Sequence, residues 1–207
     1  MPRKNAEVRR LEVLDETLNQ IRAVGMSVVR IADVAGAMGV SPALIVYHFQ
    51  TKENLLAEAL IHAAERDLAT LGRVLRGADS PATRLMAALD WYSPTGRARG
   101  WQIWIDAWSA AMRDKTLAKV LTDLHGRWVD EIAKVVADGV ETGVFTSADP
   151  RASATRITAL LDGLAVRMVV HTARPTRGEL RAWLLLQVCA ELAVEELRLL
   201  DSVPAPN

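Results

Sequence analysis

The chain has 207 residues, half of them hydrophobic, and its 25 basic side chains balance its 25 acidic ones to a formal net charge of zero. That length is enough for a small domain beside a larger one with a sizeable core. A net charge of zero excludes a generally basic protein, so any affinity for DNA must come from where the basic side chains are placed.

The cysteine count and the hydropathy pattern bear on disulfide bonds and on cellular location. Cys189 is the only cysteine, so the chain forms no internal disulfide. Its apolar neighbours favour a small core residue over the alternative, a redox sensor. The sequence has no apolar signal segment and no apolar run of membrane-spanning length, and we therefore expect a cytoplasmic protein that does not bind membranes.

Helical periodicity runs through the chain and no stretch alternates like a β-strand, which predicts an all-α fold. The first helix is expected from about Ala6 to Val24, with Gly25 ending it and Ser27 capping the next helix. Later helix starts are marked by Ser80-Pro81, by Asp149-Pro150 and by a capping box from Thr176 to Glu179.

A helix-turn-helix is predicted near the N-terminus. Apolar residues repeat at helical spacing from Ile31 to Met38, and Gly39 can take the positive φ that a sharp turn needs. Ser41 is a good N-cap, and Pro42 suits the first position of the following helix. Such a motif is typical of proteins that read the major groove of DNA.

The second helix of this motif is expected to leave Ala43, Leu44 and Tyr47 facing outward. Small or apolar groups suit base edges, whereas polar and cationic groups suit phosphates. The predicted DNA-contacting residues are Ser27, Arg30, Ser41, Pro42, Ala43, Leu44, Tyr47, His48 and Lys52. The alternative is a tight helical hairpin in which Tyr47 and Phe49 belong to the core.

The N-terminal region has a mild basic excess, because residues 1–52 carry seven Lys or Arg against five Asp or Glu, a difference of two. Arg3, Lys4, Arg9 and Arg10 form a basic opening. This opening can lie along the DNA backbone or enter a minor groove, which would add salt-dependent affinity. The alternative is an ordinary solvated terminus.

The run GVSPALIVYHFQTKENLL resembles the DNA-binding signature of the tetracycline-repressor (TetR) family of bacterial one-component regulators. The family pattern is a Gly-Val-Ser turn, a short recognition helix, an aromatic-His-Phe end and a Lys-Glu-x-Leu-Leu start to the next helix. Val46 departs from it, because most members carry a tyrosine there whose hydroxyl often reaches the DNA backbone. The resemblance implies a repressor released from a palindromic double-stranded operator by a small-molecule effector.

A second, larger domain is expected over residues 52–201, after a DNA-binding domain over residues 1–51 and before a flexible tail at 202–207. Its last two helices, 150–172 and 177–201, are apolar nearly all round, so they need more than one packing neighbour. That neighbour is either their own domain or a second copy of the chain. In the family resembled, the last two helices form a four-helix dimer interface, and we predict a homodimer.

The second domain is rich in tryptophan. Trp101, Trp104 and Trp108, with Ile105 and Met112, are predicted to share one face of a single helix. Neighbouring helices supply three more large aromatic residues, Trp91, Tyr92 and Trp128. Core packing alone is one interpretation of these side chains, and the other is a pocket for an effector.

Ionisable groups near the indoles refine the second interpretation. Asp106 is predicted to lie away from the indole face and to be solvated, whereas His125 flanks the Trp128 stripe. Asp162 lies in a largely buried helix, where a carboxylate needs a hydrogen bond, an arginine or a cationic ligand. Indoles with a carboxylate can hold an ammonium group. The predicted ligand-binding residues are Trp91, Trp101, Trp104, Trp108, His125, Trp128 and Asp162.

The stretch from Gly100 through Leu164 is similar to the ligand domain of choline-responsive, betaine-pathway repressors of the same family. This similarity supports a cationic effector beside an aromatic or hydrophobic one. The resemblance further implies that a ligand displaces the long helix beginning at Lys52 and so changes the separation of two recognition helices. Release by ligand is the default expectation, with co-repression and activation left open.

Two other classes of protein compete with a regulator. Glu58, His62 and Glu65 lie roughly on one helix face and suggest a metal-dependent enzyme, but a helical di-metal site needs a second Glu-xx-His motif. The sequence has no phosphate loop, nucleophile elbow or Cys-xx-Cys pair, so no enzyme, cofactor or metal is predicted. The other competitor is a helical protein-interaction module.

Overall fold

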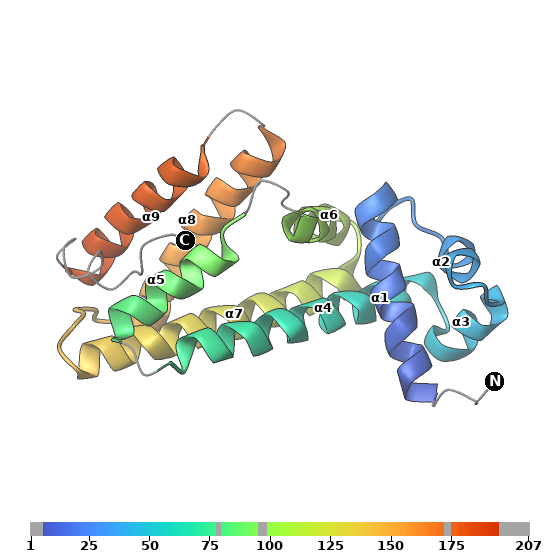
Figure 1. Ribbon diagram of the computed structural model, residues 1–207, viewed down its shortest axis with the longest axis horizontal. Helices are drawn as coiled ribbons and strands as arrows, with labels where there is room; N and C mark the ends of the chain where they lie inside the picture. The colour runs from blue at the N-terminus through green and yellow to red at the C-terminus, as the bar shows by residue number, and fades with distance from the viewer. Residues whose placement is uncertain (1–5, 78–79, 95–98, 172–174, 195–207) are drawn as a thin grey trace. The chain divides into compact units, whose positions relative to one another are not determined.

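The computed structural model describes residues 6–77, 80–94, 99–171 and 175–194 (Figure 1). Over these residues every regular element is a helix, as the sequence predicted. The helices are α1 (Ala6–Val24), α2 (Ile31–Met38), α3 (Pro42–Phe49), α4 (Lys52–Leu75), α5 (Pro81–Tyr92), α6 (Arg99–Ala111), α7 (Lys115–Glu141), α8 (Pro150–Val170) and α9 (Arg177–Leu192).

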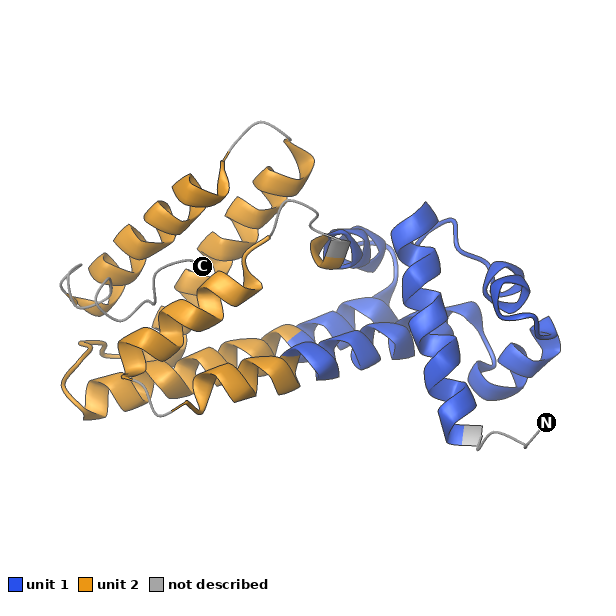
Figure 2. Ribbon diagram, viewed as in Figure 1, with its two compact units in different colours: residues 1–67, 102–124 blue, residues 68–101, 125–207 orange. Residues whose placement is uncertain are grey.

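The chain forms two compact units, coloured separately in Figure 2. Unit 1 comprises residues 1–67 and 102–124, and unit 2 comprises residues 68–101 and 125–207. Three helices, α4, α6 and α7, contribute residues to both units. The boundary predicted between residues 51 and 52 lies inside unit 1 and stays a prediction for the extent of the DNA-binding domain.

Unit 1 has its own hydrophobic core. Its buried side chains come from α1, α2, α3, α4 and the turn after α1, and the largest fully buried ones are Leu18, Ile21, Met26, Ile45, Phe49, Leu55 and Leu60. Ile103 and Ala107 of α6 belong to the same buried cluster. The core of unit 1 therefore holds the helix-turn-helix and part of α6 together.

Unit 2 has a second core, formed by parts of α4 and α7 with α5, α8 and α9. Its largest fully buried side chains are Leu71, Leu85, Met86, Ile132 and Ile157. One glycine is required here, because a Cβ on Gly139 would lie 2.0 Å from the Phe145 ring. The ring packs directly on the α7 backbone and so fixes the chain after that helix.

The predicted helix starts of unit 2 are confirmed. Ser80 Oγ accepts the Thr83 N–H at 3.2 Å, and Asp149 Oδ1 accepts the Ala152 N–H at 2.9 Å. At α9 the capping box is reciprocal: Thr176 Oγ1 accepts the Glu179 N–H, and Glu179 Oε2 accepts the Thr176 N–H. These caps satisfy backbone donors that have no partner inside their own helices.

Two predicted helix ends are wrong. The second helix is not capped by Ser27, because the Val28 and Val29 N–H groups both bond to Gly25 O and keep this segment a turn as far as Arg30. The last helix ends at Leu192 rather than near residue 201. The Leu192 carbonyl accepts the backbone N–H of Thr146 instead of continuing the helix, and Ala193 takes a left-handed conformation. Residues 195–207 lie outside the described part of the chain.

No single helix among the described ranges is long and apolar enough to cross a membrane. Among the helices that the structure describes, one pair, α2 and α3, reaches that length and composition when taken together, and the two are bent by 119° at the break between them.

Candidate functional site

The turn between α2 and α3 follows from its glycine. Gly39 has φ +64°, the left-handed region that side chains disfavour, and its N–H donates to Gly36 O at 3.2 Å. The next N–H, of Val40, donates to Ala35 O at 3.0 Å. Because three residues separate two helices that meet at 119°, the segment has the geometry of a helix-turn-helix.

Helix α3 starts where the sequence predicts. Ser41 Oγ accepts the Leu44 N–H at 3.3 Å, and Pro42 occupies the first turn, where a missing N–H costs nothing. Ile45 and Phe49 are 0% and 2% exposed and anchor one side of the helix in the core of unit 1. The opposite side is therefore held outward.

The outward side of α3 carries the residues predicted to contact DNA. Pro42, Ala43 and Tyr47 are exposed, and Tyr47 retains 81% of its accessible surface. Leu44 and His48 are half-buried. The hairpin interpretation placed Tyr47 in the core together with Phe49, and only Phe49 is there.

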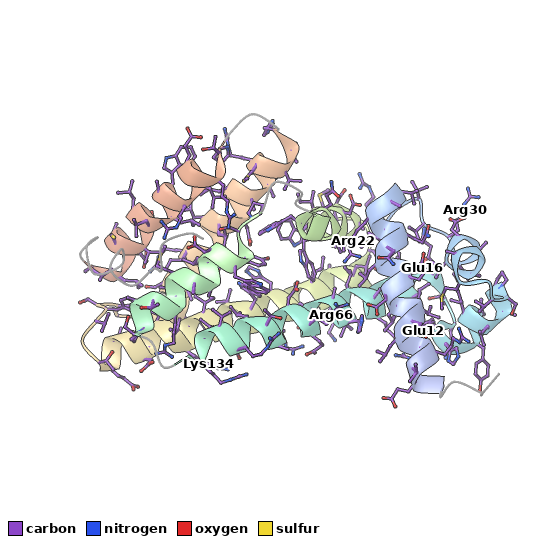
Figure 3. All side chains as sticks on the ribbon, in the orientation of Figure 1. Glu12, Glu16, Arg22, Arg30, Arg66 and Lys134 are labelled. Atoms are coloured by element: carbon purple, nitrogen blue, oxygen red, sulfur yellow. The ribbon has the colours of Figure 1, made fainter. Side chains whose placement is uncertain are left out.

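Polar residues around this surface have other contacts. Lys52 Nζ donates to Ser27 O at 3.1 Å, so the first residue of α4 holds the turn before α2. Arg30, labelled in Figure 3, is the exposed residue before α2, and its backbone N–H donates to Asp33 Oδ2 at 2.9 Å. The contacts of Ser27, Arg30 and Lys52 with DNA stay predictions.

Two of the four basic side chains in the basic opening form ion pairs within the protein. Arg9 pairs with Glu12 at 3.2 Å, and Arg10 pairs with Glu58 of α4. Arg3 and Lys4, the other two members of this opening, lie outside the described residues.

Helices α1 and α4 are joined by polar contacts in unit 1. Asp15 accepts from His62 Nε2 at 3.1 Å and from Arg66 at 3.0 Å, and Figure 3 labels Arg66 on α4. Together with the Arg10–Glu58 pair, these contacts occupy Glu58 and His62, and Glu65, the third side chain that suggested a metal, also has an interaction. Within the described part of the chain, no group of three His, Cys, Asp or Glu residues is arranged to hold a metal ion.

Four aromatic residues gather in unit 2, and we call them the aromatic cluster: Trp91, Tyr92, Trp101 and Trp128. The Tyr92 ring centroid lies 4.8 Å from that of Trp101 and 4.0 Å from that of Trp128, which stacks on Trp91 at 6.0 Å. The Trp101 Nε1–H donates to Tyr92 O at 2.9 Å. Trp91 is 38% exposed, so the cluster reaches the surface.

The predicted tryptophan stripe of α6 is divided. Trp101 belongs to the aromatic cluster, whereas Trp104 and Trp108 pack against the core of unit 1. Met112 is 75% exposed because α6 ends at Ala111. These residues share one face of α6, but Trp101 and Trp108 lie about 10.5 Å apart along the helix axis, so they meet different neighbours. A ligand role for Trp104 and Trp108 stays a prediction.

One carboxylate oxygen of Asp162, on α8, is buried without a hydrogen-bond partner among the described residues. Its Oδ1 atom and the Thr158 Oγ1 atom one turn earlier are both buried, and neither has a hydrogen-bond partner among the described residues. Burial raises the pKa of Asp162 to about 7. Leu161, the residue before it, belongs to the same buried cluster as Trp128.

His125 and Asp106 differ from each other in their contacts. His125 is exposed on α7, and its pKa is lowered, first by partial desolvation and then by the charge of Arg151.

Asp106 was predicted to be solvated, and this is wrong. It is half-buried, and its Oδ2 accepts the Met26 N–H at 3.2 Å. Helical phase within α6 cannot reveal a partner 80 residues away in sequence.

Sequence families match both parts of the chain. Residues 13–59 match the bacterial regulatory proteins of the tetR family, and residues 81–193 match the C-terminal domain of BetI-type transcriptional repressors. A similar curated protein is the HTH-type transcriptional regulator BetI of Burkholderia mallei strain NCTC 10229. It is 30% identical over 169 residues, which cover 78% of this chain and 82% of that protein. BetI of Burkholderia ambifaria strain MC40-6 is 29% identical over the same shares.

Solved structures give the same fold. A transcriptional regulator from Saccharomonospora viridis, crystallised in complex with choline, superposes with a TM-score of 0.78 at 28% identity, covering 86% of this chain and 94% of that one. A TetR-family regulator from Rhodococcus sp. superposes with a TM-score of 0.77 at 28% identity, covering 89% and 98%. The chain therefore belongs to the tetR family of bacterial transcriptional regulators, with a C-terminal domain of the BetI repressor type.

Proposed function

We propose that this regulator is a homodimeric repressor that leaves a palindromic operator when a quaternary ammonium effector such as choline binds in unit 2. The observation that carries the proposal is the buried Asp162 Oδ1 atom, which has no hydrogen-bond partner among the described residues, in the unit that also holds the aromatic cluster. The DNA-binding part rests on α3, whose buried side anchors it and whose exposed side carries Pro42, Ala43 and Tyr47.

The chemistry of unit 2 suits a soft cation. The faces of tryptophan and tyrosine rings attract cations electrostatically, and choline-type ligands are commonly held by such rings. A buried carboxylate without a hydrogen bond gains most from a ligand that brings a positive charge or a donor. The S. viridis regulator, a structural neighbour of this chain, was crystallised with choline. We propose that Trp91, Trp101, Trp128 and Asp162 contact the effector.

A dimer is supported by exposed apolar side chains on the last two helices. Val170 of α8 is 56% exposed, and Trp183 and Leu186 of α9 are 44% and 58% exposed. Helices α8 and α9 lie side by side in Figure 1, so these residues lie on neighbouring elements. A two-fold dimer presents two recognition helices, which suits two half-sites related by the same symmetry.

Release by effector requires that the ligand prefer the form that binds DNA poorly, because a ligand shifts an equilibrium only by its differential affinity. We propose this direction because the family matched by residues 81–193 consists of repressors. A regulator of transcription acts where the chromosome lies, which supports a cytoplasmic location.

The decisive experiment has two stages. Fragments of genomic DNA retained by the full-length protein are selected and sequenced, and a shared palindrome is expected because each subunit of a dimer reads one half-site. The dissociation constant for that fragment is then measured with choline and with its neutral analogue 3,3-dimethylbutan-1-ol. Choline should weaken binding and the neutral alcohol should not.

Equal effects of the two compounds would contradict the cationic effector, because they share shape and differ in charge. No effect of either on DNA binding would contradict choline-type release. A retained fragment without internal symmetry would contradict the dimer.

A further inference from the structure

The turn between α1 and α2, residues 25–30, is held by contacts from two distant helices. Asp106 of α6 accepts the Met26 N–H at 3.2 Å. Lys52 of α4 donates to the carbonyl oxygen of Ser27, the next residue, at 3.1 Å. Two adjacent residues of this turn are therefore bonded to α6 and to α4, and all of these groups belong to unit 1.

The backbone of the turn is shaped to receive the α6 carboxylate. Gly25 has φ +86°, and Asp106 Oδ2 lies 3.4 Å from where its Cβ would be. The Met26 side chain is 2% exposed and belongs to the core of unit 1. A displacement of Asp106 therefore either breaks the bond to the Met26 N–H or moves the turn that leads into α2.

Helix α6 also reaches the aromatic cluster. Trp101, in its first turn, contacts Tyr92 with its ring and donates its indole N–H to the Tyr92 carbonyl oxygen. Asp106 follows five residues later on the same helix, an axial distance of about 7.5 Å. Between them, Ile103 is buried in the core of unit 1, and Ala107 is buried just beyond.

We propose that Asp106 is the positioning residue through which an effector at the aromatic cluster acts on the helix-turn-helix. A ligand that shifts Trp101 moves α6 as a stiff element, and the Asp106 carboxylate carries this movement to the Met26 N–H and hence to the start of α2. The inference rests on the proposed function, because it assumes that the effector binds beside Trp101.

The experiment compares Asp106→Ala with Asp106→Asn and with Asp123→Ala. Alanine removes the acceptor, asparagine keeps an oxygen that can accept the Met26 N–H, and Asp123 is an exposed aspartate of the same unit. The measured quantity is the ratio of operator dissociation constants with and without saturating choline. Allosteric coupling typically gives a ratio of about 5 to 150.

Wild type, Asp106→Asn and Asp123→Ala should share one ratio, whereas Asp106→Ala should fall to within about twofold of unity, because its coupling is lost. Choline affinity, followed by indole fluorescence, should be unchanged in Asp106→Ala. A variant that had only lost stability would not lose the choline effect on operator binding while keeping normal choline affinity. A full ratio in Asp106→Ala would overturn the inference and leave the proposed function intact, whereas a wild type that does not respond to choline would overturn both.

A second measurement uses the wild type alone and stays informative even if Asp106→Ala does not fold. Amide hydrogen exchange over residues 26–33, the turn and the start of α2, should change when choline is added, because this segment follows the Asp106 carboxylate. Unchanged exchange over these residues in a protein that choline releases from DNA would overturn the inference.

Discussion

Asp162 is the carboxylate of the candidate effector site, and its protonation state should depend on pH near neutrality. Burial raises its pKa to about 7, from an ordinary value of 3.8. A group with a raised folded-state pKa contributes stability below the unfolded value, and that stability is lost as pH rises through the folded pKa. A bound cation would favour the ionised form and offset the cost of its burial.

Choline affinity should therefore increase from about pH 6 to about pH 8, because more of the protein presents an ionised Asp162. Asp162→Asn should bind choline more weakly and without this pH dependence. Titration calorimetry at several pH values checks both statements. Asp67, whose pKa burial raises to about 6, titrates in a neighbouring range, and the asparagine variant isolates Asp162 from it. An unaltered pH profile in Asp162→Asn would remove Asp162 from the effector site.

Tyr47 is the most exposed large hydrophobic side chain of α3, at 81%. Tyr47→Ala should weaken binding to all DNA sequences alike, because a backbone contact carries no base identity. Its thermal unfolding should change little, within about 0.5 kcal/mol, because the side chain leaves no cavity. Tyr47→Phe isolates the hydroxyl group. Normal operator affinity in Tyr47→Ala would exclude a phosphate contact by this residue.

At the level of elements, the α2–α3 turn depends on one backbone conformation. Gly39 has φ +64°, and apart from Gly39 and its two chain neighbours no described residue has a heavy atom within 4 Å of where its Cβ would be. Gly39→Ala should therefore destabilise the protein through backbone strain alone, by about 1–2 kcal/mol. Chemical denaturation measures the change.

A matched control lies three residues earlier. Gly36 is inside α2, and its Cβ position is equally open within the described structure. Gly36→Ala should stabilise the protein by about 0.5–1 kcal/mol, because alanine loses less conformational entropy than glycine in a helix. If both variants shifted stability in the same direction, backbone strain would not be the reason that glycine occupies position 39.

Most element boundaries could be predicted because they depend on residues a few positions apart. Ser41, Ser80 and Asp149 each cap a helix by accepting an N–H three residues later. The end of α9 could not be predicted in this way, because a backbone N–H from Thr146 takes the Leu192 carbonyl. Contacts between distant segments leave no periodic signal along the chain.

At the level of the whole molecule, dimer formation determines whether two recognition helices can act together. Leu186→Arg places a charge on an α9 side chain that is 58% exposed. If α9 forms the dimer interface, the variant should sediment as a monomer and lose affinity for the full palindrome more than for a half-site, because a buried unpaired charge is costly. An exposed position tolerates the change in the monomer. A Leu186→Arg protein that remains dimeric would exclude this face.

Local chemistry in the amino-acid sequence was sufficient for the all-α class, the helix-turn-helix and the outward side of α3, because caps, glycine turns and apolar spacing act within a few residues. It also identified Trp91, Trp101 and Trp128 as candidate neighbours. Two features were decided only by the tertiary structure: Trp101 joins the aromatic cluster while Trp104 and Trp108 pack against the core of unit 1, and Asp106 accepts the Met26 N–H. The reason is physical: helical periodicity tells which side of a helix is buried, but the partner is chosen by how distant segments pack.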